Sequence, residues 1–208
     1  MQRIVLASGN AGKLLELCEL LAGSGIELVA QSELGIDDAK ETGSTFVENA
    51  VLKARHAARA SGMPALADDS GLCVDALGGA PGLYSARYAG THGDNAANNA
   101  KLLRKLEDMP AEKRSAHFVC VLALLRNADD PDPIIATGRW HGSVLTAPRG
   151  ERGFGYDPVF LPDDGNSLGA AELEPALKNR ISHRGQALAM LREMLLPSPP
   201  GRGCPKGG

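Results

Sequence analysis

The chain has 208 residues, of which 43% are hydrophobic and 23% are charged, and its formal net charge at pH 7 is −3. These are the proportions of an ordinary globular protein, and a domain averages about 150 residues, so we expect one folded domain rather than a disordered chain. The sequence has no run of lysine and arginine, which argues against nucleic acid as a partner. Its apolar stretches fall short of the roughly 18 residues of a membrane span.

The cysteines of the chain are widely separated, at Cys18, Cys73, Cys120 and Cys204. Without a C-x-x-C pair, this spacing argues against structural zinc and against a disulfide framework. The apolar run at the amino terminus is too short for a signal peptide. We therefore expect a soluble protein in the reducing cytoplasm.

The first part of the chain alternates between strand and helix patterns. Residues 2–7 form a short apolar run, residues 8–13 form a glycine-bearing turn, and apolar residues then recur at helical spacing over 14–21. Residues 26–30 predict a second strand. This order of elements indicates an α/β fold.

A long helix is predicted next, from the capping box of Thr45 and Glu48 to about Ser61. A short strand follows at 64–67 and runs into an acidic segment at 68–71. Apolar residues at helical spacing mark the expected buried face of the helix: Val47, Ala50, Val51, Ala54 and Ala58.

The second half of the chain continues this alternation. Residues 94–107 predict a helix, and residues 116–125 are apolar on both faces, as in a central strand. Residues 134–145 predict a more polar strand, and a glycine-rich loop follows at 149–158. Ser182 is expected to cap a last amphipathic helix. The histidines and the tryptophan on the two predicted strands are interpreted as packing or surface residues: His117, Trp140 and His141.

The chain shows neither an internal repeat nor a linker between these elements. We therefore expect a single domain over residues 1–196. Residues 197–208 are rich in proline and glycine and have no means of burying apolar surface, so they are predicted to be a disordered tail.

The turn between the first strand and helix is a candidate phosphate-binding loop. Backbone N–H groups and the positive end of a helix converge at such a turn, and a lysine there adds a full charge. It is not a Walker A loop, because the first glycine and the final serine or threonine are missing. An ordinary turn with a solvated lysine remains the alternative. The residues of the loop are Ser8, Gly9, Asn10, Ala11, Gly12 and Lys13.

Two adjacent carboxylates, Asp68 and Asp69, stand at the end of the short strand predicted at 64–67. Such neighbours repel each other, so we expect a cation between them, and Mg²⁺ suits carboxylates combined with substrate phosphates. Glu41 could add a third carboxylate. An acidic, solvated turn is the alternative. The triplet that begins at Asp69 also occurs in aspartic proteases, but those enzymes are all-β and carry a hydrophobic residue before the aspartate.

Two further segments carry candidate binding groups. The loop 154–157 has two aromatic side chains that could either stack on a planar base or anchor the loop. At the start of the last helix, Lys178, His183 and Arg184 are donors suited to carbonyl oxygens or phosphates, and an ordinary polar helix start is the alternative. Lys53 by itself is typical of a solvated helix face.

Together these motifs resemble the inosine/xanthosine triphosphate pyrophosphatase family. The likeness extends from residue 1 to about 196 and is carried by residues 8–13, 41–54, 67–90, 153–160 and 178–187. The resemblance implies an elongated, two-lobed α/β fold around a long central mixed sheet, with the active site in the cleft between the lobes. It also implies a homodimer that uses Mg²⁺ to hydrolyse dITP, ITP and XTP between the α and β phosphates.

The resemblance further implies a role for each candidate residue. Residues 8–13 would hold the triphosphate, Lys53 would neutralise phosphate charge, and Ser70 would touch the substrate. Glu41 and Asp69 would hold the metal with Asp68 beside them, and Asp69 would also be the general base. The purine would be held by Phe154, Gly155, Tyr156, Asp157, Lys178, His183 and Arg184. One departure from the family pattern is Lys40, which stands where related sequences often have a second acid.

The donors of the purine site suggest how bases are distinguished. Hypoxanthine and xanthine present an oxygen at C6, where adenine presents an amino group. Hydrogen-bond donors of the protein that face C6 would therefore favour hypoxanthine and xanthine over adenine. Guanine shares this oxygen, and its rejection is not explained. Two alternatives to the main hypothesis remain: a nucleotide-binding module without turnover, and a pyrophosphatase for other modified nucleotides, as in the related septum-formation inhibitor group.

Overall fold

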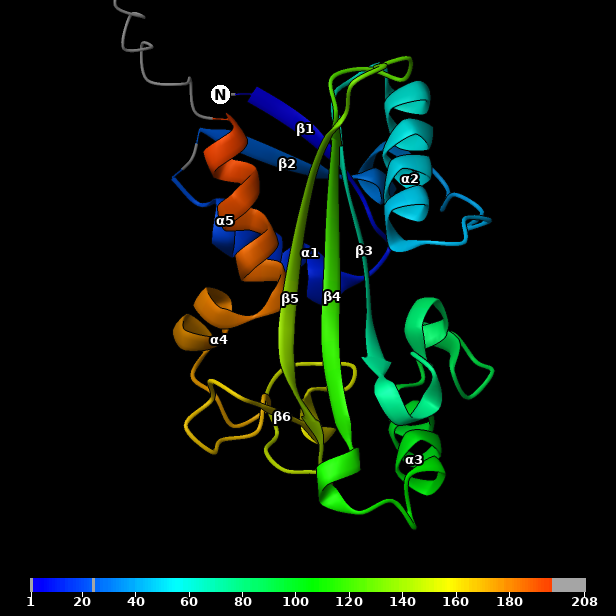
Figure 1. Ribbon diagram of the computed structural model, residues 1–208. Coiled ribbons are helices and arrows are strands. Elements are labelled where there is room, and N and C mark those ends of the chain that lie inside the picture. Colours follow the sequence, from blue (N-terminus) through cyan, green and yellow to red (C-terminus); the bar gives the residue numbers. More distant parts are fainter. Residues whose placement is uncertain (1, 24, 196–208) are drawn as a thin grey trace, which may run out of the picture.

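A mixed sheet forms the middle of the computed structural model, which describes residues 2–23 and 25–195 (Figure 1). Within these residues the sheet has six strands, and β1 is parallel to β2 and β3, whereas β3, β4, β5 and β6 are antiparallel neighbours. The prediction of an α/β fold around a long mixed sheet is therefore confirmed. The strands in spatial order are β2 (Ile26–Ala30), β1 (Gln2–Ala7), β3 (Ala65–Val74), β4 (Ser115–Leu125), β5 (Ile134–Val144) and β6 (Phe160–Pro162).

Helices cover both faces of the sheet (Figure 1). Helices α1 (Ala11–Leu21) and α5 (His183–Leu195) pack on one face, where their leucines meet Leu66 of β3. Helix α2 (Phe46–Ser61) packs on the other face, against Ala67 and the alanines and valines of the neighbouring strands. Each face of β3 therefore belongs to a different set of helices.

Helix α2 begins and ends as its sequence predicts. Thr45 and Glu48 form the capping box, and Gly62 ends the helix with a φ of 68°, a left-handed conformation that favours glycine. The expected buried face is wrong at Val47, which is 41% exposed. In the first turn of α2, Phe46 packs against the hydrophobic cluster of this face, whereas Val47 lies outside that cluster because successive residues of a helix point about 100° apart.

Strand β3 is longer than the sequence predicts. The acidic segment 68–71 lies inside a strand that continues to Val74, because it pairs with β4 along its whole length. On its other edge β3 pairs with β1 only as far as Ala67, opposite Ala7. The edge of β3 is therefore open beyond Ala67 until Cys73 meets Pro81.

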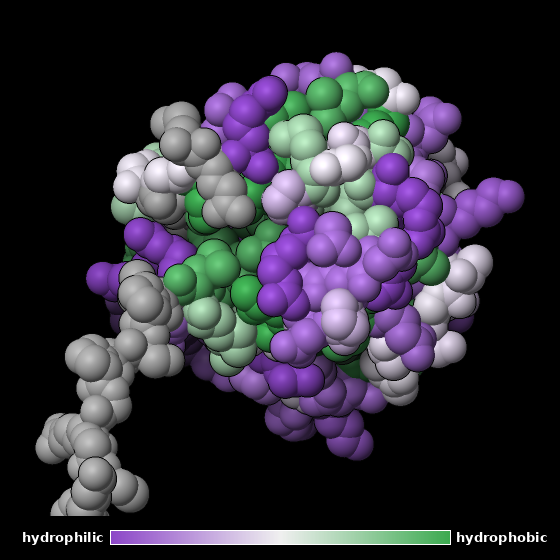
Figure 2. Space-filling model, turned by 90° about the horizontal axis from the view of Figure 1, so that it is seen from above, coloured by the Kyte–Doolittle hydropathy of each residue, from purple (hydrophilic) through white to green (hydrophobic). Residues whose placement is uncertain are grey.

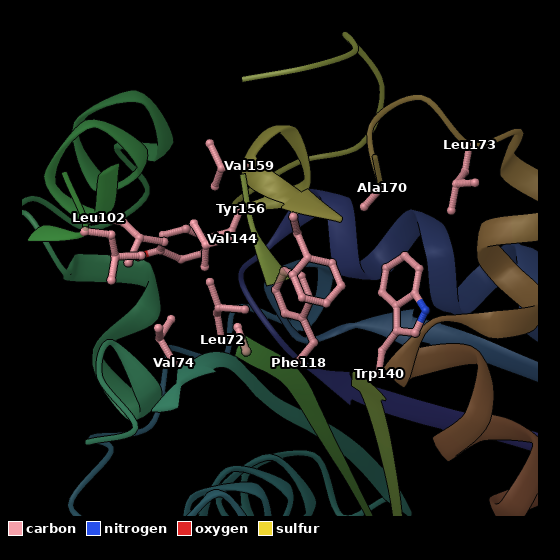
Figure 3. Packing of buried hydrophobic residues seen from close by; sticks show 13 residues of the cluster. Leu72, Val74, Leu102, Phe118, Trp140, Val144, Tyr156, Val159, Ala170 and Leu173 are labelled. Carbon is pink, nitrogen blue, oxygen red and sulfur yellow. The ribbon is translucent and has the colours of Figure 1, made fainter. Parts of the chain in front are cut away.

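A second lobe surrounds the far ends of β3, β4 and β5 (Figure 1). It contains a short 3-10 helix, η3 (Gly82–Arg87), with α3 (Asn95–Lys105), β6 and α4 (Pro175–Ile181). Its core is aromatic, with Phe118 and Trp140 from the long strands beside Leu72 (Figure 3). Trp140 is 1% exposed, which confirms its interpretation as a packing residue.

The surface of the molecule is mixed in character. Seen from above, hydrophobic residues gather in small patches that hydrophilic residues separate (Figure 2). No helix among the described residues has the length and apolar character that a membrane span requires. The predicted tail, residues 197–208, lies outside the described residues.

Candidate active site

The adjacent aspartates of β3 point to opposite faces of the sheet. Successive side chains of a strand alternate, so Asp68 lies on the face of α1 and α5 with Leu66, and Asp69 lies on the face of α2 with Ala67. The expectation of one cation between the two carboxylates is therefore wrong. Each aspartate has its own cationic partners instead.

Asp68 is the fully buried centre of a polar cluster at the cavity wall. Lys13 Nζ lies 2.6 Å from its Oδ1, Ser70 Oγ donates to the same oxygen at 2.8 Å, and Arg184 Nε donates to Oδ2 at 2.8 Å. The Cys120 thiol donates to Oδ2 at 3.2 Å. Burial by itself would raise the pKa of Asp68, but Arg184 and Lys13 outweigh it and hold that pKa well below its usual range. Asp68 is thus suited to anchoring these cations rather than to accepting a proton.

Asp69 belongs to a different ionic cluster. Lys53 Nζ lies 2.6 Å from Asp69 Oδ1 and 3.0 Å from Glu41 Oε1, and Arg87 Nη1 lies 3.3 Å from Glu41 Oε2. Burial raises the pKa of Asp69 above its ordinary value, despite the opposing effect of Lys53. The Lys53 side chain is 13% exposed, so it is not a solvated surface lysine. A carboxylate of raised pKa that faces a cavity is suited to general-base chemistry.

Glu16 is a site residue that the sequence interpretation missed. It lies on α1, one turn after Lys13, and its carboxylate accepts from Lys178 Nζ at 2.9 Å and from Arg184 Nη1. Lys178 also donates to Asp157 Oδ2 at 2.8 Å. These contacts bring the predicted purine-binding donors together, although Lys178 lies in α4 and Arg184 in α5.

The two aromatic residues of the loop 154–157 do different things. Tyr156 is buried, and its hydroxyl donates to the Ser85 backbone oxygen at 2.9 Å, so it anchors the loop. Phe154 is half-buried at the cavity, and its ring centre lies 5.4 Å from Lys178 Nζ. A Cβ on Gly12 would lie only 3.0 Å from this ring. Phe154 is therefore the aromatic side chain placed for stacking.

His183 is buried between the two lobes. Its ring stacks on Phe118 with ring centres 4.7 Å apart and an interplanar angle of 9°. Burial lowers the pKa of His183 well below its usual range, so the imidazole is neutral. Among the described residues, no hydrogen-bond partner lies at its buried Nδ1. An unpaired buried nitrogen at a cavity wall suits a polar group of a ligand.

The candidate phosphate loop is shorter than predicted, because α1 begins at Ala11 and only residues 8–10 precede it. Asn10 caps α1, its side chain accepting from the Lys13 N–H at 3.1 Å, so the first turn of the helix faces the loop. Gly9 approaches Asp38 so closely that a Cβ would lie 2.9 Å from the carboxylate. A free helix N-terminus next to Lys13 is a recurrent phosphate-binding arrangement.

One cavity of about 640 Å³ connects these groups. It lies at the open edge of β3 and is lined by residues of both lobes, so side chains from both faces of the sheet reach it. Of the predicted residues, Asp68 and Gly12 do not line it. The lining ones are Ser8, Gly9, Asn10, Lys13, Glu41, Lys53, Asp69, Ser70, Phe154, Gly155, Tyr156, Asp157, Lys178, His183 and Arg184.

The donor set of the cavity fits Mg²⁺ only in combination with a substrate. No group of three or more His, Cys, Asp or Glu side chains in the described part of the chain could hold a metal ion. Glu41 and Asp69 nevertheless present two carboxylates that share Lys53. Because Mg²⁺ is commonly held by one or two carboxylates plus phosphates and waters, this pair is the site that suits it.

Comparisons with known proteins agree over nearly the whole chain. A dITP/XTP pyrophosphatase of Xanthomonas campestris is 63% identical over 195 residues, which are 94% of this chain and 98% of that protein. A dITP/XTP pyrophosphatase of Vibrio cholerae is 56% identical over 191 residues, 92% of this chain and 95% of that protein. The solved structure of a HAM1 protein from Coxiella burnetii superimposes with a TM-score of 0.86 at 52% identity, covering 94% of this chain and 98% of that one.

The profile of the Ham1 family matches residues 4–194. The match includes both faces of the cavity, from the phosphate loop to Arg184. The chain therefore belongs to the Ham1 family, in agreement with the family resemblance of its sequence motifs.

Proposed function

We propose that this protein hydrolyses non-standard purine nucleoside triphosphates, namely dITP, ITP and XTP, to the monophosphate and pyrophosphate. The observation that carries the proposal is the position of Asp69 in the cavity. On one face of β3, Asp68 and Glu16 hold the purine-binding donors in place, and on the other face lies the Glu41–Lys53 pair. Asp69 lies between these two groups. A nucleotide bound along this line presents its phosphates to Asp69, Lys13 and the Glu41–Lys53 pair.

The chain's own residues then supply binding and proton transfer. The N–H groups of the phosphate loop and Lys13 hold the α phosphate. Lys53 neutralises the negative charge of the β and γ phosphates. Asp69 accepts the proton of a water that attacks the α phosphorus. Its raised pKa makes it a stronger base than an ordinary aspartate. Ser70 lies beside Asp69 at the cavity wall and contacts the substrate.

Mg²⁺ held by Glu41 and Asp69 would neutralise the triphosphate and orient its oxygens. Glu41 is suited to this task, because burial by itself would raise its pKa but Lys53 and Arg87 outweigh it and lower that pKa. Lys53 stays charged as well, since Asp69 and Glu41 raise its pKa against the effect of burial. Glu41 and Lys53 thus form an ion pair next to Asp69.

The purine site explains the preference for a C6 oxygen over the C6 amino group of adenine. Lys178 and Arg184 are held by carboxylates, so their remaining N–H groups face the cavity as fixed donors, with Phe154 available for stacking. The C6 oxygen of hypoxanthine or xanthine satisfies such donors. The amino group of adenine leaves them unpaired, at a cost of about 1–3 kcal/mol for each buried donor. ITP should therefore be preferred over ATP by orders of magnitude.

The experiment is to measure pyrophosphate release from ITP, dITP, XTP, GTP and ATP, each with Mg²⁺ and with EDTA. The proposal requires Mg²⁺-dependent release from the first three, at least about 100-fold faster than from ATP and GTP, which is about 2.7 kcal/mol. Equal rates on all five would retain the phosphate site and refute the account of the purine site.

Absence of release from every nucleotide would favour the alternative of a binding module without turnover. Asp69→Asn separates the two directly, because it should abolish turnover and largely spare nucleotide binding in an enzyme. A modified nucleotide turned over in preference to ITP would favour the other alternative. We further propose that the protein acts as a homodimer, as the family resemblance implies, which sedimentation velocity would test. We also propose that it acts in the cytoplasm, as the spacing of its cysteines indicates, which cell fractionation would test.

A further inference from the structure

The charged side chains of the cavity form two series of contacts that start at the adjacent aspartates. The first series leads from Asp68 toward the purine site, and the second leads from Asp69 away from it. The last member of the second series is Arg87, which is separated from Lys178 by the largest number of contacts. In order, the contacts are Asp68–Arg184–Glu16–Lys178–Asp157 on one face and Asp69–Lys53–Glu41–Arg87 on the other.

Arg87 is the last residue of η3 and belongs to the second lobe, whereas Glu41 belongs to the first. The backbone of η3 is fixed by Ser85, whose hydroxyl accepts from the Leu72 N–H at 3.0 Å and donates to the Gly82 oxygen at 2.6 Å. The hydroxyl of Tyr156 donates to the Ser85 backbone oxygen as well. The guanidinium is therefore carried into the cavity from a firmly held segment.

The side chain of Arg87 has unused binding capacity. It lines the cavity, it is 35% exposed, and among the described residues its hydrogen bond is the one of 3.3 Å between Nη1 and Glu41 Oε2. A guanidinium has several further N–H donors arranged as a planar fork, which matches the oxygens of a phosphate group, and it stays charged at all relevant pH values.

We propose that Arg87 binds the leaving pyrophosphate, that is, the β and γ phosphates of the substrate. This inference rests on the proposed function. In that reaction a bond forms between the water oxygen and the α phosphorus, and the bond to the bridging oxygen breaks. The electron pair stays on that oxygen, so the pyrophosphate gains negative charge while Asp69 takes the proton. Arg87 stands at the far end of the second contact series, on the side of the leaving pyrophosphate, and a guanidinium there stabilises the negative charge that the pyrophosphate as a whole gains.

The test compares Arg87→Gln and Arg87→Lys with Arg104→Gln, a matched control at an exposed arginine in the last turn of α3. Calorimetry measures the affinity for inorganic pyrophosphate and, separately, for inosine monophosphate, with Mg²⁺ present. Arg87→Gln should weaken pyrophosphate at least about tenfold, or about 1.4 kcal/mol, and leave the monophosphate within about twofold. Arg87→Lys should fall in between, because it keeps the charge and loses the fork, and Arg104→Gln should match the unchanged protein.

Unchanged pyrophosphate affinity in Arg87→Gln would overturn the inference, and so would an equal loss of monophosphate affinity, which is the result expected if Arg87 only holds the lobes together. An unchanged protein that binds no pyrophosphate would overturn it too. Turnover of ITP by the unchanged protein is measured in parallel and tests the proposed function by itself. The two failures are thereby distinguishable, since binding of the products needs no turnover.

Discussion

Replacing Asp68 by asparagine should lower the unfolding temperature far more than the same replacement at the neighbouring Asp69. Asp68 has a side chain that is 0% exposed, and two of its partners, Lys13 and Arg184, are cations with side chains 15% and 3% exposed. Asparagine keeps the shape but removes the charge, and it turns an NH₂ group toward these donors. Removing one partner of a buried ion pair costs about 3–5 kcal/mol.

That cost corresponds to a fall of about 6–20 °C in Tm, because a domain of this size loses about 2–4 °C for each kcal/mol. At Asp69 the expected cost is smaller. Lys53 keeps Glu41 as a partner at 3.0 Å, and folding already disfavours the charged form of Asp69, because its pKa is raised in the folded protein. We expect Asp69→Asn to change the free energy of unfolding by no more than about 1 kcal/mol and to lower turnover by about 10²–10⁴-fold, the usual contribution of a general base.

The assay is thermal unfolding followed by circular dichroism at neutral pH, with ITP turnover measured on the same preparations. The reasoning is refuted if the decrease in Tm is the same for both variants, or if Asp68→Asn unfolds at the same temperature as the unchanged protein. A further check is to measure ITP turnover by Asp68→Asn at a temperature well below the Tm of that variant. The KM for ITP should be raised, because Lys13 and Arg184 no longer have the carboxylate that holds them in place.

Four other outcomes follow from the site. The pH profile of kcat/KM should fall on the acid side through a pKa above the ordinary 3.8 of aspartate, because only ionised Asp69 accepts a proton and its pKa is raised; a limb at the ordinary value would contradict this. Glu16→Gln should lower the ratio of kcat/KM for ITP over ATP about tenfold, since Lys178 and Arg184 lose their common carboxylate, and an unchanged ratio would count against this role. Gly12→Ala should raise the KM for ITP several-fold with little change in Tm, because the new methyl group displaces Phe154; an unaltered KM would show that this contact does not matter. Removal of residues 197–208, beyond the family match at 4–194, should leave turnover intact, and a large loss would contradict the single-domain assignment.

The parts of the fold that the sequence predicted well are those with local causes. The capping box at Thr45 depends on residues within one helical turn, so its pattern can be read directly. The same holds for β4, whose residues 115–125 are apolar on both faces because helices cover both sides. Short-range chemistry sufficed in these segments.

The errors arose where a partner distant in the sequence decides the outcome. The segment 68–71 continues a strand because it pairs with residues 119–122 of β4, and this pairing separates Asp68 from Asp69. Two adjacent acids in a turn and in a strand look alike in the sequence. The acidic pair signalled a functional position, but not that each carboxylate would have its own cations.

Glu16 was missed for the same reason, because its partners are distant in the sequence. On α1 it lies outside the leucine face, so helical spacing assigns it to solvent. Its partners are Lys178 and Arg184, which come more than 160 residues later in the chain. Helix α4 was also missed, because a helix that spans only Pro175–Ile181 gives little periodicity. The proline at its start was the available signal.

The early end of β1 has a consequence for how specificity can evolve. The cavity lies where β3 loses its neighbour. The groups proposed to meet the base come from α4, α5 and the loop 154–157, whereas those proposed to meet the metal and the water come from α2, the segment before it and Asp69 of β3. The sheet separates the two sets, so a substitution in one leaves the packing of the other in place. Recognition and cleavage can thus be altered one at a time, and a new nucleotide can be accepted without rebuilding the machinery that cuts it.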